Sequence, residues 1–105
     1  MANFHDAFRQ GASQNVAYAV AGGASAASTA FGSQTYWIRV VAVGVVGATN
    51  DGVRILVGDG TPTAVATSTL LPLNWVETYA VSPGQKIACL SNNATVGNLN
   101  VTELS

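Results

Sequence analysis

The sequence contains very little charge. Of its 105 residues, 4 are Lys or Arg and 5 are Asp or Glu, so charged residues make up 9% of the chain, against about 25% in an average soluble domain. Binding to phosphates requires clustered cations, whereas Arg9, Arg39, Arg54 and Lys86 are scattered along the chain. The composition argues against a nucleic-acid partner. It also implies that much of the surface is either uncharged and polar or covered by another protein.

Cysteine and histidine are each present once, as Cys89 and His5. A single cysteine excludes an internal disulfide, and this pair is too small a set of ligands for a zinc site. A Cys–His catalytic pair would need the two side chains in contact, but His5 lies near the N-terminus and Cys89 lies within an expected strand. Asp51 and Asp59 each precede a glycine, which favours turn formation over calcium binding. We therefore expect no catalytic residue, no metal and no cofactor.

Long apolar runs are also missing. The longest, WIRVVAVGVVGA, covers Trp37–Ala48 and contains Arg39, whereas a membrane-spanning helix needs about 20 apolar residues. The first 14 residues include Asp6 and lack the apolar core of a signal peptide. We expect a protein that is made in the cytoplasm and has no membrane partner.

What the sequence does contain, from residue 15 onward, is a β pattern. Short stretches rich in β-branched and aromatic residues alternate with turn residues, and no helix is indicated after residue 12. We predict one all-β domain over 15–105, a small β-sandwich of jelly-roll-like or immunoglobulin-like type with seven to eight strands. Residues 1–14 form an N-terminal arm, extended or briefly helical. The strands are expected in QNVAYAVA, weakly at Ser28–Phe31, at Thr35–Val46, Val53–Gly58, Thr67–Leu71 (an edge strand), Asn74–Val81 and Lys86–Ser91, and in NLNVTELS.

The segment VSPGQKIACL predicts a tight turn. Pro and Gly occupy the central positions of Ser82–Gln85, as a type II turn requires. We expect this turn to join two strands into a hairpin. Lys86 and Cys89 differ by three positions, so they point to opposite faces of one strand and cannot form a reactive pair. Cys89 is expected to be a packing residue.

The N-terminal arm carries two phenylalanines, Phe4 and Phe8, which would share one face of a helix. Two interpretations stay open. The arm is either a frayed terminus or a binding segment that places Phe4 and Phe8 in pockets of a partner, with Arg9 or Asp6 at the polar rim.

The two tryptophans, Trp37 and Trp75, also have two interpretations. Exposed indole rings can stack on sugars or nucleotides, whereas the alternative is packing in the core or in an interface. Trp37 shares its strand face with Arg39, Val41 and Val43, so that face is largely apolar. This pattern favours packing, and we expect Trp37 and Trp75 to contribute to an oligomer or partner interface.

The order of motifs in the second half resembles a known class of proteins. GDGTPTAVATSTLLPLNWVETYAVSPGQKIACLSNNATVGNLNVTELS covers Gly58–Ser105, and QNVAYAV and AASTAFGSQTYWIRVVAVG precede it. Together they resemble the small β-sandwich structural proteins that decorate or cement the capsids of tailed bacteriophages. The resemblance covers Gln14–Ser105 and leaves the arm outside. The segment GVVGATNDG, around Gly44–Gly52, has no counterpart in that pattern.

This resemblance implies a role as well as a fold. It implies a jelly-roll-like virion protein on the outer surface of the capsid, which binds the major capsid protein, bridges its subunits and has no enzymatic activity. It further implies a homo-oligomer, with a trimer at a local threefold axis preferred to a dimer at a twofold axis. The alternatives are a carbohydrate-binding module and a head or tail appendage of the virion.

Overall fold

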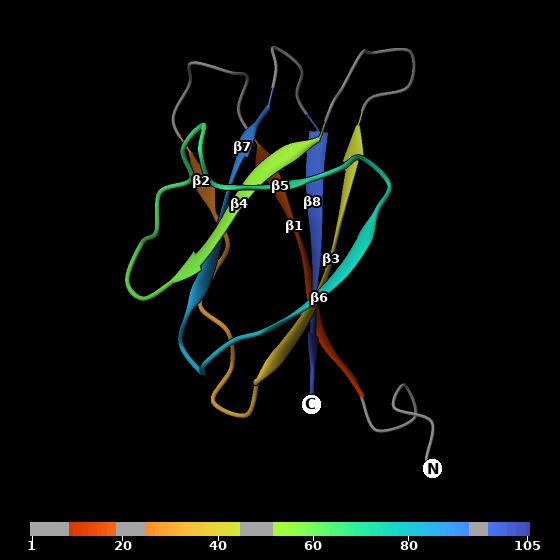
Figure 1. Cartoon of the computed structure of the whole chain (residues 1–105). Helices are drawn as coiled ribbons and strands as arrows, with labels where there is room; N and C mark the ends of the chain where they lie inside the picture. The colour runs from red at the N-terminus through yellow and green to blue at the C-terminus, as the bar shows by residue number, and fades with distance from the viewer. Residues whose placement is uncertain (1–8, 19–24, 45–51, 93–96) are drawn as a thin grey trace.

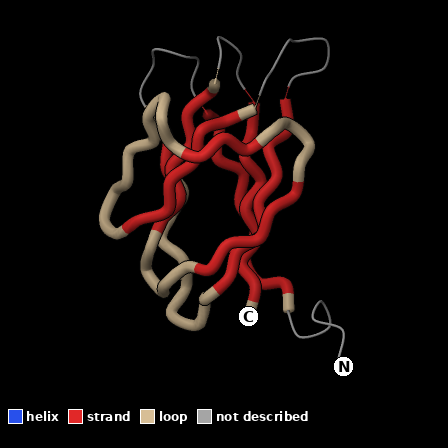
Figure 2. Tube along the Cα trace, viewed as in Figure 1, coloured by secondary structure: helices blue, strands red, loops and turns tan. Residues whose placement is uncertain are grey.

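The computed structural model describes residues 9–18, 25–44, 52–92 and 97–105, and there it contains only strands and loops (Figure 2). The predicted all-β fold is confirmed. Within these ranges no helix is long and apolar enough to cross a membrane. The strands are β1 (Gln10–Tyr18), β2 (Ala26–Ala27), β3 (Trp37–Gly44), β4 (Val53–Gly58), β5 (Thr69–Leu71), β6 (Val76–Ala80), β7 (Lys86–Ser91) and β8 (Gly97–Leu104).

The strands form two four-stranded antiparallel sheets that face each other (Figure 1). Sheet A has the order β1-β8-β3-β6, and sheet B has the order β2-β7-β4-β5. The outer pairs of each sheet are β1 with β8 and β3 with β6, then β2 with β7 and β4 with β5. This is the pairing of one long antiparallel ribbon folded over on itself, which is the topology of a jelly roll.

The core lies between the sheets and is built from side chains that alternate in direction along the strands. In β3, Ile38, Val40 and Ala42 are fully buried while the residues between them face outward. In β4, Val53 and Ile55 are buried, whereas Arg54 is half-buried and Leu56 is exposed. The remaining core members follow the same rule from the other strands and their connections: Val16, Tyr18, Phe31, Leu71, Val81, Ile87, Cys89, Leu99 and Val101.

The N-terminal arm is shorter than the sequence suggested. Residues 10–14 of the expected arm already belong to β1, which pairs with β8 from Gln10 to Tyr18 through a register shift between Gln10 and Ser13. Gly11 lies within β1 and packs against the Glu103 backbone, whose carbonyl oxygen would lie 3.3 Å from a Cβ at position 11.

The weak strand expected at Ser28–Phe31 is wrong. The strand in this region is β2, the two residues Ala26–Ala27, paired with Cys89 and Ala88. Phe31 is buried in a loop, where its N–H donates to the Gln85 carbonyl (2.8 Å). The small side chains of this segment carry no alternation, so pairing with β7 decides where the strand lies.

The turn at Ser82–Gln85 is confirmed, but the hairpin is not. Gln85 N–H donates to the Ser82 carbonyl (3.1 Å), and Gly84 has φ of 82°, as the third residue of a type II turn requires. The strands on its two sides belong to different sheets, because β6 pairs with β3 and β7 pairs with β4 and β2. The turn therefore connects sheet A to sheet B.

Candidate interaction surface

The outer face of sheet A carries exposed apolar side chains along β3 and β6. Val41 lies directly opposite Val76, Trp37 lies opposite Ala80, and Val43 continues the row on β3. Val43 and Val76 are each 47% exposed and Trp37 is 37% exposed, so part of each side chain is accessible to a partner. We call this group the β3–β6 apolar face; its members are Trp37, Val41, Val43, Val76 and Ala80.

The other half of the same sheet face is polar. Asn100 Nδ2 donates to Asn15 Oδ1 (2.9 Å), and the hydroxyls of Ser13 and Thr102 share a hydrogen bond of 3.0 Å. These pairs join β8 to β1 with no ionised group. The only cation on the outer side of β3 is Arg39. The sheet face is thus divided into an apolar half and an amide- and hydroxyl-rich half.

The outer side of sheet B differs, because a loop is tied back over it. Ala64 N–H in the loop after β4 donates to Ser25 Oγ (2.9 Å), beside β2. Arg54 donates through Nη1 to the Ser68 carbonyl (3.1 Å) and through Nε to Asn92 Oδ1 (2.9 Å). Ala64 and the outward-facing Ala88 are buried as a result. Sheet A therefore offers the more open face.

A second group of side chains lies on the inner side of β6 and just before it. Trp75, Glu77 and Tyr79 have the same strand parity, and Trp75 Nε1 donates to Glu77 Oε1 (2.7 Å). Trp75 is 57% exposed, the highest value among the large apolar residues of the described chain. Asn74, with φ of 62°, redirects the backbone immediately before this row.

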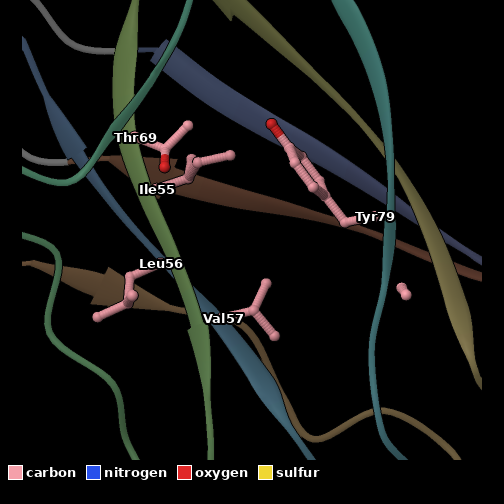
Figure 3. Close-up of a pocket in the computed structure, with 6 residues that line it drawn as sticks. Ile55, Leu56, Val57, Thr69 and Tyr79 are labelled. Carbon is pink, nitrogen blue, oxygen red and sulfur yellow. The ribbon is translucent and has the colours of Figure 1, made fainter.

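Tyr79 also lines a groove between the sheets. Figure 3 shows its ring reaching from β6 toward Ile55 and Thr69 of sheet B. The groove has a volume of about 170 Å³, and its walls are mostly aliphatic, from Ile55, Leu56 and Val57. Burial raises the pKa of the Tyr79 phenol, and the neighbouring Glu77 carboxylate raises it further. Tyr79 is therefore a neutral hydrogen-bonding group at physiological pH.

Glu103 lines a second hollow, of about 240 Å³, together with the C-terminal residues Leu104 and Ser105. Its Oε1 accepts hydrogen bonds from Gly32 N–H (2.8 Å) and from the Thr35 hydroxyl. Its parity with Leu99 and Val101, which can be read from the sequence, turns it toward the core. The carboxylate fixes the turn before β3, which makes its role structural.

Cys89 is fully buried between the sheets. Burial raises the pKa of its thiol to about 12, so it is protonated and a poor nucleophile at neutral pH. Lys86 lies on the opposite face of β7, as predicted from parity. Among the described residues, no group of three or more His, Cys, Asp or Glu side chains could hold a metal ion.

The two tryptophans predicted to contribute to an interface do not lie together. Trp37 aligns with Ala80 and Trp75 precedes Val76, so the two indoles lie at opposite ends of the β3–β6 ladder, roughly 16 Å apart along the strand. Arg9 is exposed, while its backbone exchanges two hydrogen bonds with Ser105 (2.8 and 3.0 Å). Phe4 and Phe8 lie outside the described residues.

The described residues therefore define an eight-stranded jelly-roll sandwich with an exposed apolar half-face on one sheet. Comparisons with protein-family models, with curated proteins and with solved structures gave no significant match. We therefore infer the function from the geometry and chemistry of the exposed surface.

Proposed function

We propose that this protein is a non-enzymatic virion structural protein that binds the outer surface of a bacteriophage capsid. It cements the shell by bridging neighbouring copies of the major capsid protein. The observation that carries the proposal is the β3–β6 apolar face. Three of its large side chains, Trp37, Val43 and Val76, are exposed on the outer side of sheet A. Exposed apolar patches of this kind typically mark protein–protein contacts.

The chemistry of the surface supports association with protein in preference to other partners. The apolar half-face is bordered by neutral amides and hydroxyls, and Arg39 is the one cation on β3. Such a surface lacks the clustered positive charge that nucleic acid or anionic lipid requires. The resemblance of Gln14–Ser105 to capsid decoration proteins supplies the identity of the protein partner.

Cementing works by mass action. A protein that binds the assembled shell, and not its separated subunits, stabilises the shell in proportion to the logarithm of its free concentration over its dissociation constant. A homo-oligomer strengthens this effect, because the second contact of a bridged pair is effectively intramolecular. Modest contacts by Trp37, Val43 or the arm residues Phe4, Phe8 and Arg9 would then suffice.

Co-sedimentation with expanded capsids of the same virus tests the proposal. The wild-type protein should pellet with capsids and raise their resistance to heat. A Trp37→Ser/Val43→Ser variant should remain folded and show at least about tenfold weaker binding, which is the loss expected for removing two partly buried contacts. A matched control, Leu56→Ser on the outer side of sheet B, should bind normally. Equal binding by all three proteins would contradict the proposed surface.

The role of the arm needs a separate deletion. Removing residues 2–8 leaves the backbone pairing of Arg9 with Ser105 intact, so the domain should fold. If Phe4 and Phe8 are anchors, this deletion and a Phe4→Ala/Phe8→Ala variant should weaken capsid binding alike. Unchanged binding of both variants would restrict the contact to the domain.

A second function, recognition of a carbohydrate by a virion appendage, is favoured by one observation. Trp75 is 57% exposed and its indole is held in place by Glu77, the combination of flat ring and adjacent carboxylate that suits sugar stacking. A glycan array with Trp75→Ala as control tests it. Binding of a glycan that is lost in Trp75→Ala would favour this function over cementing.

A further inference from the structure

The free side of β6 is a sheet edge with neither a bulge nor a positive charge, and its one charged side chain is Glu77. In the described chain β6 pairs with β3 alone and is the last strand of sheet A. It contains no Lys, Arg or Pro, and its pairing with β3 shows no register shift. The other edge of sheet A, β1, carries such an irregularity between Gln10 and Ser13. Bulges and edge charges are the usual protection against pairing with another chain, and β6 lacks a bulge.

The hydrogen bonds to β3 identify which backbone groups of β6 are free. Val81 N–H donates to the Tyr36 carbonyl (2.9 Å), and hydrogen-bonded pairs alternate along an antiparallel ladder. The next hydrogen-bonded pairs along this ladder are therefore Tyr79 with Ile38 and Glu77 with Val40, joined through their backbone groups. The N–H and C=O groups of Val76, Thr78 and Ala80 point away from β3, and the side chains of all three are exposed.

We propose that β6 pairs antiparallel with β6 of a second copy of this chain, so that two copies of sheet A form one continuous sheet across a twofold axis at Thr78. In this register Val76 lies opposite the partner's Ala80 and Thr78 lies opposite the partner's Thr78. Each of the three pairs exchanges two hydrogen bonds. Every free backbone group of β6 is then used, which no other symmetric register achieves.

The side chains select the same register. It places Glu77 opposite the partner's Tyr79, so that an acceptor faces a neutral hydroxyl donor. A shift that centres the axis on Glu77 would put two carboxylates directly opposite each other, where like charges destabilise. On the outer face, Ala80 lies between Trp37, its neighbour on β3, and the partner's Val76. Because the alanine side chain is small, the large side chains on its two sides come close together. The β3–β6 apolar faces of the two copies thereby become one surface.

This pairing is isologous, so it closes as a dimer and favours the dimer over the trimer that the resemblance suggested. It concerns the homo-oligomer included in the proposed function, but it is tested without capsids. A monomer in solution that still binds capsids would overturn only the pairing. A dimer that binds no capsid would overturn only the proposed function.

Cysteine cross-linking of the full chain tests the register. Thr78→Cys should give a covalent dimer on mild oxidation, because the two Cα atoms lie about 5.5 Å apart in a hydrogen-bonded pair, within disulfide range. The matched control Ala80→Cys should not cross-link, since the two positions lie roughly 13 Å apart along the strand. The native Cys89 is buried and stays unreactive. Cross-linking of Ala80→Cys at an equal or higher rate overturns the proposal.

Sedimentation velocity of the unmodified chain supplies the second readout. We expect a concentration-dependent dimer. Thr78→Pro should raise its dissociation constant about 30-fold, since the central pair loses both N–H donors and each bond contributes roughly fivefold. The Thr78 N–H makes no bond to β3, so proline is compatible with this edge; Thr78→Val is the control that keeps the dimer. A wild-type monomer or trimer at all concentrations refutes the pairing.

Discussion

Replacing Gly97 with alanine should strongly destabilise the domain, because position 97 has no room for a side chain. Gly97 begins β8 and pairs on one side with Tyr18 of β1 and on the other with Gly44 of β3. A Cβ at this position would overlap the Tyr18 hydroxyl and the Val43 carbonyl oxygen. Tyr18 is 1% exposed, so its ring cannot swing into solvent.

The magnitude follows from what must move. Overpacking a rigid site costs about 1–3 kcal/mol. Displacing Tyr18 also breaks its hydrogen bond to the Val43 carbonyl (3.4 Å), which adds roughly 1 kcal/mol. We expect the free energy of unfolding to fall by about 3 kcal/mol, a large share of the ~5–15 kcal/mol available to a typical domain. The melting temperature should fall by about 12 °C or more.

Urea denaturation of a double-mutant cycle tests the cause. Tyr18→Phe removes the hydroxyl that the new methyl group would meet, so Gly97→Ala should cost at least about 1 kcal/mol less when it is combined with Tyr18→Phe than when it is made alone. Gly58→Ala is the matched control: Gly58 also lies in a strand, and a Cβ there would meet Pro62 at an ordinary 3.4 Å. Additive effects of the two substitutions, or a loss at Gly58 equal to that at Gly97, would refute the reasoning.

Three further predictions concern stability and binding. Cys89 has its thiol pKa raised to about 12, so the protonated folded form is favoured. Between pH 9 and pH 12, the free energy of unfolding of the wild-type protein, measured by urea denaturation, should fall more steeply than that of Cys89→Ala. The difference in slope should be about 1.4 kcal/mol per pH unit, and parallel curves would contradict this. Glu103→Ala leaves Gly32 N–H and the Thr35 hydroxyl without their acceptor and should cost about 2–4 kcal/mol by thermal melting, with Glu103→Gln costing less. Val43→Thr, on the exposed face, should change stability by under about 0.5 kcal/mol yet weaken capsid co-sedimentation, and a large loss of stability would show that Val43 packs in the core.

The strands that the sequence predicted best are those bounded by turn residues on both sides. Val53–Gly58 and Lys86–Ser91 were predicted with the bounds that the structure gives them. The edge strand expected at Thr67–Leu71 is an edge strand in the structure, but it begins two residues later, at Thr69. In each, alternation or a β-branched run ends at Gly, Pro or Ser, so local chemistry fixes the limits. The all-β class follows from the repetition of this pattern.

The pairing of strands could not be predicted in the same way. The turn at Ser82–Gln85 is locally a hairpin turn, yet its flanking strands enter different sheets. The turn is instead held by hydrogen bonds to a distant segment. Gly84 N–H donates to the Phe31 carbonyl (3.0 Å), and Phe31 N–H donates to the Gln85 carbonyl. A turn motif carries no information about a segment some fifty residues away.

The candidate surface was predictable in part. The shared face of Trp37, Val41 and Val43 follows from parity, and the structure places that face outside the core. Parity gave only a weak indication of which side of β3 would be buried, because both sides are largely apolar and Arg39 alone marks the outer one. The position of Trp75 also depends on Asn74, whose positive φ has no clear mark in the sequence.

The central position of β8 in sheet A has a consequence for synthesis. Although β8 follows the other strands in the chain, it lies between β1 and β3, so β1 has no partner in sheet A and β3 has only β6 until residues 97–104 have left the ribosome. Until then β1, β3 and β6 expose their apolar sides without a completed layer. Folding of the sandwich therefore waits for β8, and the closure of so distant a strand belongs to the slow, nonlocal class of folding reactions. During that interval the nascent chain exposes apolar surface and unpaired strand edges, which in general favour misassembly.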